Sequence, residues 1–322
     1  MIGTDNTPKI KELNIEDCPK GAISRFWLRL AADGIGTAIH IPVMVARGMQ
    51  DGLTLGITAA VHGNELNGIP VIQRLFSEIE PTQLKGTVVG VPVVNVPGYL
   101  LMQRKFNDGI DLNRIMPGKA NGNNSEVYAH RFVQRVLTHF DYLLDLHTAS
   151  FGRINSYYIR ANMEDKTTAE LAHLQHAQII LNSPAPDQTV RGTATRMGKK
   201  AITLEVGDPN VFQKGIIRSG LTGMHNTLAY LGMVEEEIEQ PETPPIVCSH
   251  SYWIYTDKGG VLQVLPKVTQ PIQKGECIAI LRNIFGDKLR EYYAPEDGIV
   301  IGKSVHPVAQ TGSRILHLGV LE

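Results

Sequence analysis

Apolar runs of strand length alternate with segments of helical periodicity over the first two thirds of the chain. Residues 53–61 (LTLGITAAV) and 86–94 (GTVVGVPVV) have the length and composition of buried strands. Between them, the apolar residues of segment 67–79 recur at helical spacing, and Pro81 follows as a stop signal. A strand, a helix and a second strand in this order are typical of a parallel α/β sheet.

The alternation continues along the chain. The further elements expected are a helix over 125–139 with Ser125 as its N-cap, a strand over 141–146 that leads into His147, a strand over 201–206 that contains Glu205, and a helix over 215–231. We therefore predict an α/β fold with a mixed, largely parallel sheet and flanking helices. In such open sheets ligands bind beyond the carboxyl ends of the strands, where His62, His147 and Glu205 are all expected.

A change in composition marks a domain boundary after Met233. Residues 235–239 are mostly acidic and lead into a proline-rich segment, 240–245 (QPETPP), which suits neither a helix nor a central strand. Beyond it, short β-like runs are separated by glycine-containing turn signals. We predict a larger domain over 1–240 and a small all-β domain over 246–322.

The bulk composition narrows the classes of partner. The chain has 31 Lys and Arg against 32 Asp and Glu, so its formal net charge of -1 gives no field that attracts nucleic acid or an anionic membrane. The three cysteines are far apart and form no Cys-x-x-Cys pair, which argues against a disulfide framework or a cysteine zinc site. The sequence has no leader-like start and no apolar run of membrane-spanning length, so we expect a cytoplasmic location.

A histidine and a carboxylate stand three positions apart where a strand is expected to lead into a helix. This spacing lets His62 and Glu65 face one point, and catalytic zinc commonly takes two His and one Glu while it keeps a fourth position for water. His147, at the end of another strand, is the candidate third ligand, and Asp145 beside it is a candidate partner for the imidazole. A His-x-x-Glu pair alone is more often two solvated side chains than a metal site, so the pattern by itself leaves both interpretations open.

Two further stretches complete a resemblance to a known family. Residues 59–68 (AAVHGNELNG), 104–118 (RKFNDGIDLNRIMPG), 143–150 (LLDLHTAS) and 203–209 (TLEVGDP) resemble, in this order, the succinylglutamate desuccinylase and aspartoacylase family of the zinc carboxypeptidase clan. The resemblance runs from about residue 40 to the β-rich tail. It implies a zinc carboxypeptidase-like larger domain, and it is specific for the family but weakly specific for the substrate.

The resemblance implies a role for each matching residue. One zinc ion per chain would be bound by His62, Glu65 and His147, and Glu205 would be the catalytic base and acid. Asn113 and Arg114 would bind a carboxylate of the substrate, and Arg104 would stabilise the developing oxyanion.

Other positions have two interpretations. Arg153, Asn155 and Tyr157 follow the His147 strand and either line the pocket or form an exposed polar loop. Some relatives place a substrate-facing tyrosine in the tail, so Tyr292 and Tyr293 are candidates, although packing is the simpler explanation for at least one of them. Asp111 is expected to orient its loop rather than to contact substrate. The first 40 residues are left open between a strand and an arm.

The tail resembles the barrel-sandwich modules that carry biotin or lipoyl groups. Its turn at 294–298 (APEDG) lacks the lysine that such a carrier needs, so covalent carriage is not expected. In the resembled family a C-terminal β module crowds the zinc cleft, which implies restricted access and a small substrate. The function expected is zinc-dependent removal of an acyl group from a small N-acyl amino acid; the alternative is a metallocarboxypeptidase that acts on short peptides. A non-catalytic binding protein is disfavoured by the retained ligands and base, and homo-oligomerisation is left open.

Overall fold

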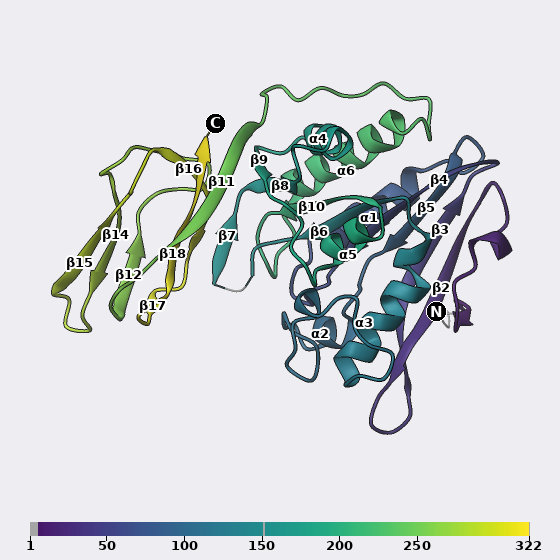
Figure 1. The fold of residues 1–322 in the computed structure, drawn as a ribbon, viewed down its shortest axis with the longest axis horizontal. Coiled ribbons are helices and arrows are strands. Elements are labelled where there is room, and N and C mark those ends of the chain that lie inside the picture. The colour runs from purple at the N-terminus through teal and green to yellow at the C-terminus, as the bar shows by residue number, and fades with distance from the viewer. Residues whose placement is uncertain (1–5, 151, 322) are drawn as a thin grey trace, which may run out of the picture.

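The computed structural model describes residues 6–150 and 152–321. Its largest element is a mixed sheet whose centre is parallel, in the order β5-β4-β6-β10 (Figure 1). These four strands are β5 (Lys85–Val91), β4 (Gln50–Ala59), β6 (Tyr142–His147) and β10 (Lys200–Val206). Apart from the exposed start of β4, these strands are mainly buried and apolar because helices cover both faces of the sheet.

Strands of both directions flank this centre. On one side lie β3 (Ala38–Arg47), β2 (Ala22–Ala32) and β1 (Lys9–Ile10). On the other side β8 (Tyr157–Ala161) runs antiparallel to β10, and β9 (Ile179–Asn182) runs parallel to β8. Among the described residues before position 40, β1, β2 and the start of β3 are therefore strands at this side of the sheet, which decides between the strand and the arm left open by the sequence.

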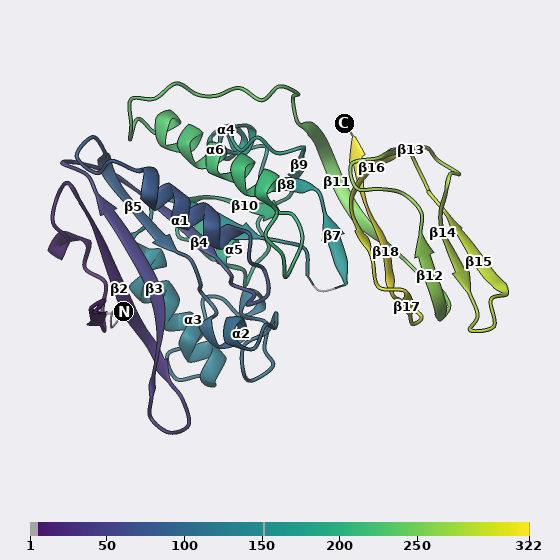
Figure 2. The ribbon, with the colours of Figure 1, turned by 180° about the vertical axis from the view of Figure 1, so that it is seen from behind.

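Helices lie on the two faces of the sheet (Figure 2). One face packs against α1 (Gly68–Glu78), α4 (Lys166–His173) and α6 (Lys214–Tyr230), and the other against α3 (Asn124–Arg135) and α5 (Val190–Arg196). The shorter helices are α2 (Val96–Leu100) and the 3-10 turns η1 (Ile15–Asp17), η2 (Leu112–Arg114) and η3 (Leu137–His139). None of the helices in the described ranges has the length and apolar character needed to cross a membrane.

The predicted helix over 125–139 begins earlier and ends sooner than expected. Asn123, not Ser125, is the N-cap of α3, because the Asn123 side chain accepts a hydrogen bond from the Glu126 amide while Glu126 caps the Asn123 amide in return. The helix ends at Arg135, and η3 follows as a separate turn.

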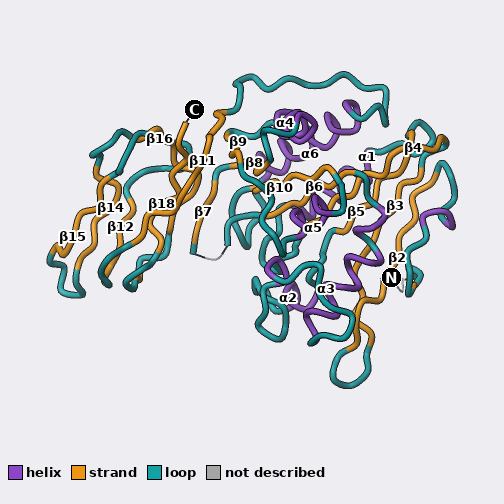
Figure 3. The backbone as a smooth tube through the Cα atoms, viewed as in Figure 1, coloured by secondary structure: helices purple, strands orange, loops and turns teal. Residues whose placement is uncertain are grey.

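The tail is an all-β unit joined to the main sheet (Figure 3). After a segment without helix or strand over 235–245, β11 (Ile246–Tyr255) pairs with β9 and with β18 (Arg314–Leu321), and the sheet continues through β16 (Gly298–Ser304) to β13 (Pro271–Ile272). The second sheet consists of β15 (Lys288–Tyr293), β14 (Cys277–Arg282), β12 (Gly260–Val264) and β17 (Val308–Ala309). A separate apolar cluster fills the space between the two sheets.

A second strand contact ties the tail to the larger part of the chain. The short strand β7 (Arg153–Asn155) pairs with β16, with Asn155 opposite Gly302. The loop that follows His147 is therefore anchored on the C-terminal unit. The α/β fold with a small C-terminal β unit is as predicted.

Candidate active site

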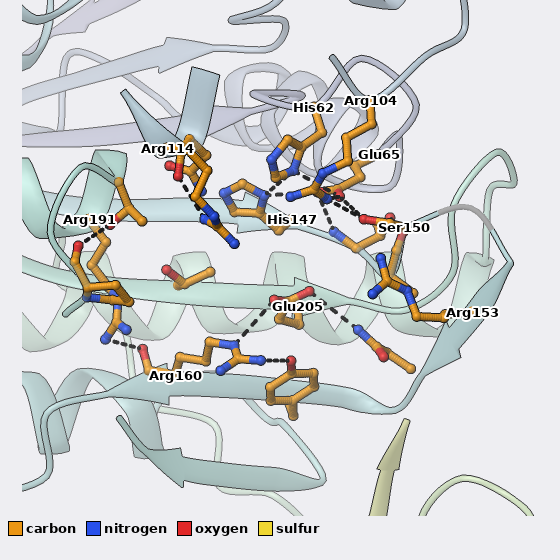
Figure 4. Close-up of a pocket in the computed structure, with 18 of the residues that line it drawn as sticks. His62, Glu65, Arg104, Arg114, His147, Ser150, Arg153, Arg160, Arg191 and Glu205 are labelled. Atoms are coloured by element: carbon orange, nitrogen blue, oxygen red, sulfur yellow. Dashed lines mark hydrogen bonds and ion pairs between the residues drawn. The ribbon is translucent and has the colours of Figure 1, made fainter. Parts of the chain in front are cut away.

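The predicted site residues come together at the carboxyl ends of the central parallel strands. His62 and Glu65 lie in the turn between β4 and α1, and His147 is the last residue of β6. Glu205, the penultimate residue of β10, is the direct neighbour of His147 in the strand register. These residues line one cavity of about 250 Å³ (Figure 4).

The turn that carries His62 and Glu65 is shaped by Gly63. A Cβ at Gly63 would lie 2.1 Å from the backbone carbon of Gly98, so only glycine allows this close approach. The Glu65 amide donates to the His62 carbonyl at 3.1 Å, which closes the turn and directs both side chains to the same point.

The side chains of His62, Glu65 and His147 form a tight buried cluster. One ligand-type atom from each lies within 4.8 Å of the others. The two carboxylate oxygens of Glu65 lie 2.9 Å from His62 Nδ1 and 2.8 Å from His147 Nδ1, and the two Nδ1 atoms are 3.2 Å apart. Burial alone would raise the pKa of Glu65, but the two imidazoles outweigh it and hold that pKa well below its usual range.

Each imidazole has a second carboxylate on its far nitrogen. Asp145 Oδ2 lies 2.9 Å from His147 Nε2, and Thr58 donates to the other oxygen of Asp145 at 2.6 Å. Asp111 Oδ1 lies 3.1 Å from His62 Nε2 and also accepts from the Asn113 amide at 2.9 Å. Asp145 was predicted to have this position. Asp111 orients its loop, as expected, and its contact with His62 was not foreseen.

Glu205 lies apart from the cluster but within the same cavity. Its carboxylate is 3.4 Å from Arg160 Nε and 3.4 Å from Asn155 Nδ2, and 15% of its side chain is exposed. Both contacts are long, so this carboxylate is held loosely and remains open to a ligand.

The three candidate substrate-side residues line the cavity as well. Arg104 donates to Glu65 at 3.0 Å and to Asp111 at 3.1 Å, so its guanidinium lies directly beside the cluster of His62, Glu65 and His147. Asn113 Oδ1 accepts from the Val190 amide at 2.8 Å and fixes its loop on α5. Arg114 is exposed and makes no ion pair with any described residue, its one recorded hydrogen bond being to the Asn113 carbonyl at 2.8 Å.

The structure distinguishes between the other candidates. Arg153 and Asn155 line the cavity, whereas Tyr157 is buried in the core and the next residue, Tyr158, lines the cavity instead. Tyr292 and Tyr293 are outside the lining: Tyr292 donates to Asp257 and Tyr293 to Glu291.

The lining residues that were not foreseen include Arg160, Arg191, Trp253 and Arg314. Two of them, Trp253 and Arg314, belong to the C-terminal unit, where the Arg314 guanidinium lies 5.2 Å from the centre of the Trp253 ring. Arg153 lies 5.7 Å from the same ring, so the two arginines share one indole.

Comparison with known proteins agrees with the resemblance seen in the sequence. A model of the succinylglutamate desuccinylase/aspartoacylase catalytic domain matches residues 51–231, more than half of the chain. The chain belongs to this family. The family prediction is therefore confirmed.

Named relatives are deacylating enzymes. The chain is 26% identical over 291 residues to N-alpha-acetyl-L-2,4-diaminobutyric acid deacetylase of Halomonas elongata. This match covers 86% of this chain and 85% of that protein. It is 29% identical over 205 residues to succinylglutamate desuccinylase of Pseudomonas paraeruginosa, of which it spans 61%, while the match covers 58% of this chain.

Solved structures agree with the fold over almost the whole chain. The succinylglutamate desuccinylase/aspartoacylase of Rhodobacter sphaeroides superposes with a TM-score of 0.85 at 21% identity, over 95% of this chain and 98% of that one. The product-bound ectoine utilization protein of Ruegeria pomeroyi gives a TM-score of 0.83 at 22% identity, over 94% and 97%.

Proposed function

We propose that His62, Glu65 and His147 bind one zinc ion. If each imidazole donates its Nε2 proton to its own carboxylate, Asp111 or Asp145, both Nδ1 atoms present lone pairs to each other and to Glu65. Three electron-pair donors converging on one point repel one another unless a cation lies between them. Two imidazole nitrogens and one carboxylate are a donor set that suits zinc.

We propose further that the chain is an amidohydrolase that removes the acyl group from a small N-acyl amino acid. The observation that carries this is the position of Glu205, an unclustered carboxylate one strand away from His147. When bound, zinc would polarise the scissile carbonyl and bring the pKa of a bound water to about 7. Glu205 would take a proton from the attacking water and return it to the departing amine.

The arginines have complementary parts in this proposal. Arg104, beside the cluster, would donate to the carbonyl oxygen as negative charge develops on it. Arg114 would hold the carboxylate of the amino acid portion, since its fork is not engaged by any described carboxylate. Asn113 would keep Arg114 in place through its bond to Val190.

The nature of the substrate is supported by the relatives. One relative is named as a deacetylase and the other as a desuccinylase, and both names describe hydrolysis of an amide on a small amino acid. Neither name denotes a peptidase. We propose the same class of substrate for this chain.

We also propose that residues 1–240 form the catalytic domain and that residues 246–322 restrict access to it. Trp253 and Arg314 of the C-terminal unit line the cavity, and the β7–β16 pairing fixes that unit beside the site. A long peptide would have to displace this wall, whereas a small acyl amino acid would not.

The test is hydrolysis of N-acetyl, N-succinyl and N-formyl amino acids and of short peptides by the zinc-loaded protein, with amine release as the readout. We expect turnover of acyl amino acids that is lost in His62→Ala and Glu205→Gln and kept in the matched exposed control Glu242→Gln. Turnover of peptides alone would overturn the deacylase proposal in favour of a carboxypeptidase.

A further inference from the structure

The short strand β7 links the C-terminal unit to the candidate base. Its last residue, Asn155, is buried and lines the cavity. Asn155 Nδ2 lies 3.4 Å from Glu205 Oε2, while Arg160 Nε lies 3.4 Å from Glu205 Oε1. Each oxygen of the carboxylate therefore faces a donor from a different strand, β7 or β8. Because both contacts are long, the direction of the carboxylate depends on where these donors are held.

The backbone of Asn155 is anchored on the segment that follows Glu205. The Asn155 amide donates to Asp208 Oδ1 at 3.0 Å, and Asp208 stands three residues after Glu205. The other oxygen of Asp208 accepts from Gln213 Nε2 at 3.0 Å, which fixes the loop between β10 and α6. Asn155 is therefore bound, through its backbone and its side chain, to the same stretch of chain that carries the candidate base.

The side chain of Asn155 is oriented by the C-terminal unit. Asn155 pairs with Gly302 of β16, and a Cβ at position 302 would lie 2.3 Å from Asn155 Oδ1. Gly302 is not among the glycines with positive φ, so its backbone conformation does not call for glycine. The close approach of the Asn155 amide does, because the amide oxygen lies against the bare backbone of β16. A carboxylate accepts hydrogen bonds and donates none, so the amide presents its nitrogen to Glu205 and its oxygen to Gly302.

We propose that Asn155 is a positioning residue for Glu205 and that Gly302 sets the orientation of Asn155. The inference rests on the proposed function for the role of Glu205 as the base. It gives the C-terminal unit a part in the reaction beyond restricting access, since Gly302 does not itself line the cavity. A base meets the proton of the attacking water in one direction, so a small rotation of its carboxylate lowers the rate of the transfer.

Steady-state kinetics of Asn155→Ala and Gly302→Ala tests the inference in the zinc-loaded chain. The substrate is the N-acetyl or N-succinyl amino acid that the wild type hydrolyses fastest. We expect each substitution to lower kcat by about tenfold and to change KM by less than about twofold, because a misdirected base affects the chemical step rather than binding. The control Gly259→Ala, at an exposed turn of the same unit where the nearest atom to a Cβ is 3.3 Å away, should keep the wild-type kcat.

The double variant separates the orientation of Asn155 from a general disturbance of the C-terminal unit. When Asn155→Ala has removed the amide, a Cβ at position 302 no longer has an amide to displace, so adding Gly302→Ala should lower kcat no further. If the two losses multiply, Gly302→Ala acts through packing elsewhere and the inference is overturned. A rise in KM with kcat unchanged would overturn it as well.

The double variant also covers the case in which Gly302→Ala alone does not fold. Thermal unfolding should then show that folding is restored when Asn155→Ala removes the overlapping amide. Failure of the double variant to fold, beside a folded Asn155→Ala, would overturn the part assigned to Gly302.

A measurement without turnover distinguishes this inference from the proposed function. NMR of the chain carrying isotope-labelled asparagine detects the side-chain amide of Asn155, which is identified by its absence in Asn155→Ala. We expect this signal to shift in Glu205→Gln and in Gly302→Ala but not in Gly259→Ala, and a signal that ignores either of the first two changes would overturn the inference. If the signal shifts as expected while Glu205→Gln keeps full turnover, the contact stands and the proposed role of Glu205 as the base fails.

Discussion

Glu205 and His147 lie directly opposite each other on the neighbouring parallel strands β10 and β6. Residues paired in this way project to the same face of a sheet, so the candidate base and a candidate metal ligand are fixed by backbone hydrogen bonds rather than by loops. The distance between the base and the reaction centre is therefore set by the spacing of two adjacent strands. Such rigidity is what a proton transfer at a defined atom needs.

The first prediction concerns the proton transfer itself. Glu205→Gln keeps the size of the side chain and removes its basicity, so we expect kcat to fall by about 10² to 10⁴-fold. Zinc content, measured by elemental analysis, should stay at the wild-type level because Glu205 does not belong to the cluster of His62, Glu65 and His147. Unchanged turnover with zinc retained would show that Glu205 is not the base.

A second prediction concerns the carboxylate behind His147. Asp145→Asn removes the charge that faces His147 Nε2 at 2.9 Å, and we expect zinc affinity to fall by about 10 to 100-fold. A metal-competition titration with a chromogenic chelator measures this. Asp141→Asn, on the exposed residue just before the same strand, is the matched control and should bind zinc as the wild type does.

The convergence of the site was predictable because it follows from strand order. His62 follows an apolar run, His147 ends one and Glu205 is the last but one residue of another, and the carboxyl ends of parallel strands meet at one edge of a sheet. The sequence also contained the correct cap of α3, since Asn123 stands three residues before Glu126, the spacing of a capping box.

Other contacts depend on register and on long-range packing. Tyr157 was a candidate where Tyr158 lines the cavity, because a shift of one residue along a strand moves a side chain to the other face. Tyr158 is paired with Glu205 across β8 and β10, and Arg160 is two residues further along. Arg191, Trp253 and Arg314 come from a helix and from the C-terminal unit, and no local pattern indicates that those elements reach the site.

A third prediction concerns Arg114. Arg114→Lys keeps the charge but loses the planar fork, so we expect KM for an acyl amino acid to rise by about tenfold or more, the equivalent of about 1.5 kcal/mol for one charge-assisted hydrogen bond. Steady-state kinetics with the free acid and with its carboxamide measures this. The difference in KM between the two compounds should be smaller for Arg114→Lys than for the wild type. An equal rise in KM for both compounds would contradict a contact between Arg114 and the carboxylate.

The fourth prediction is a dependence of stability on pH. Burial holds the pKa of His317 well below its usual value, and the charges of Arg160, Arg314 and Arg153 act in the same direction. Below about pH 6.5 the unfolded chain takes up a proton that the folded chain does not, so the free energy of unfolding should fall by up to about 1.4 kcal/mol per pH unit. Above that pH this contribution is constant.

Denaturant unfolding between pH 5 and 8 measures the slope. His317→Gln can keep the hydrogen bond to Ser251 and should flatten the acid side of the profile, whereas His173→Gln, at an exposed position, should not. Parallel profiles for His317→Gln and the wild type would exclude His317 as the source.

The last prediction concerns the wall that Trp253 forms at the cavity. The guanidiniums of Arg153 and Arg314 lie 5.7 Å and 5.2 Å from the centre of its indole, which stacks on His317 with ring centres 5.0 Å apart. Trp253→Ala should therefore open the cavity at the wall formed by the C-terminal unit. We expect kcat/KM for an acylated tetrapeptide, relative to an acyl amino acid, to rise by about tenfold, or about 1.4 kcal/mol. Tyr255→Ala, on the same strand but outside the lining, is the control. If the wild type already hydrolyses the tetrapeptide as fast as the amino acid derivative, the C-terminal unit does not restrict access.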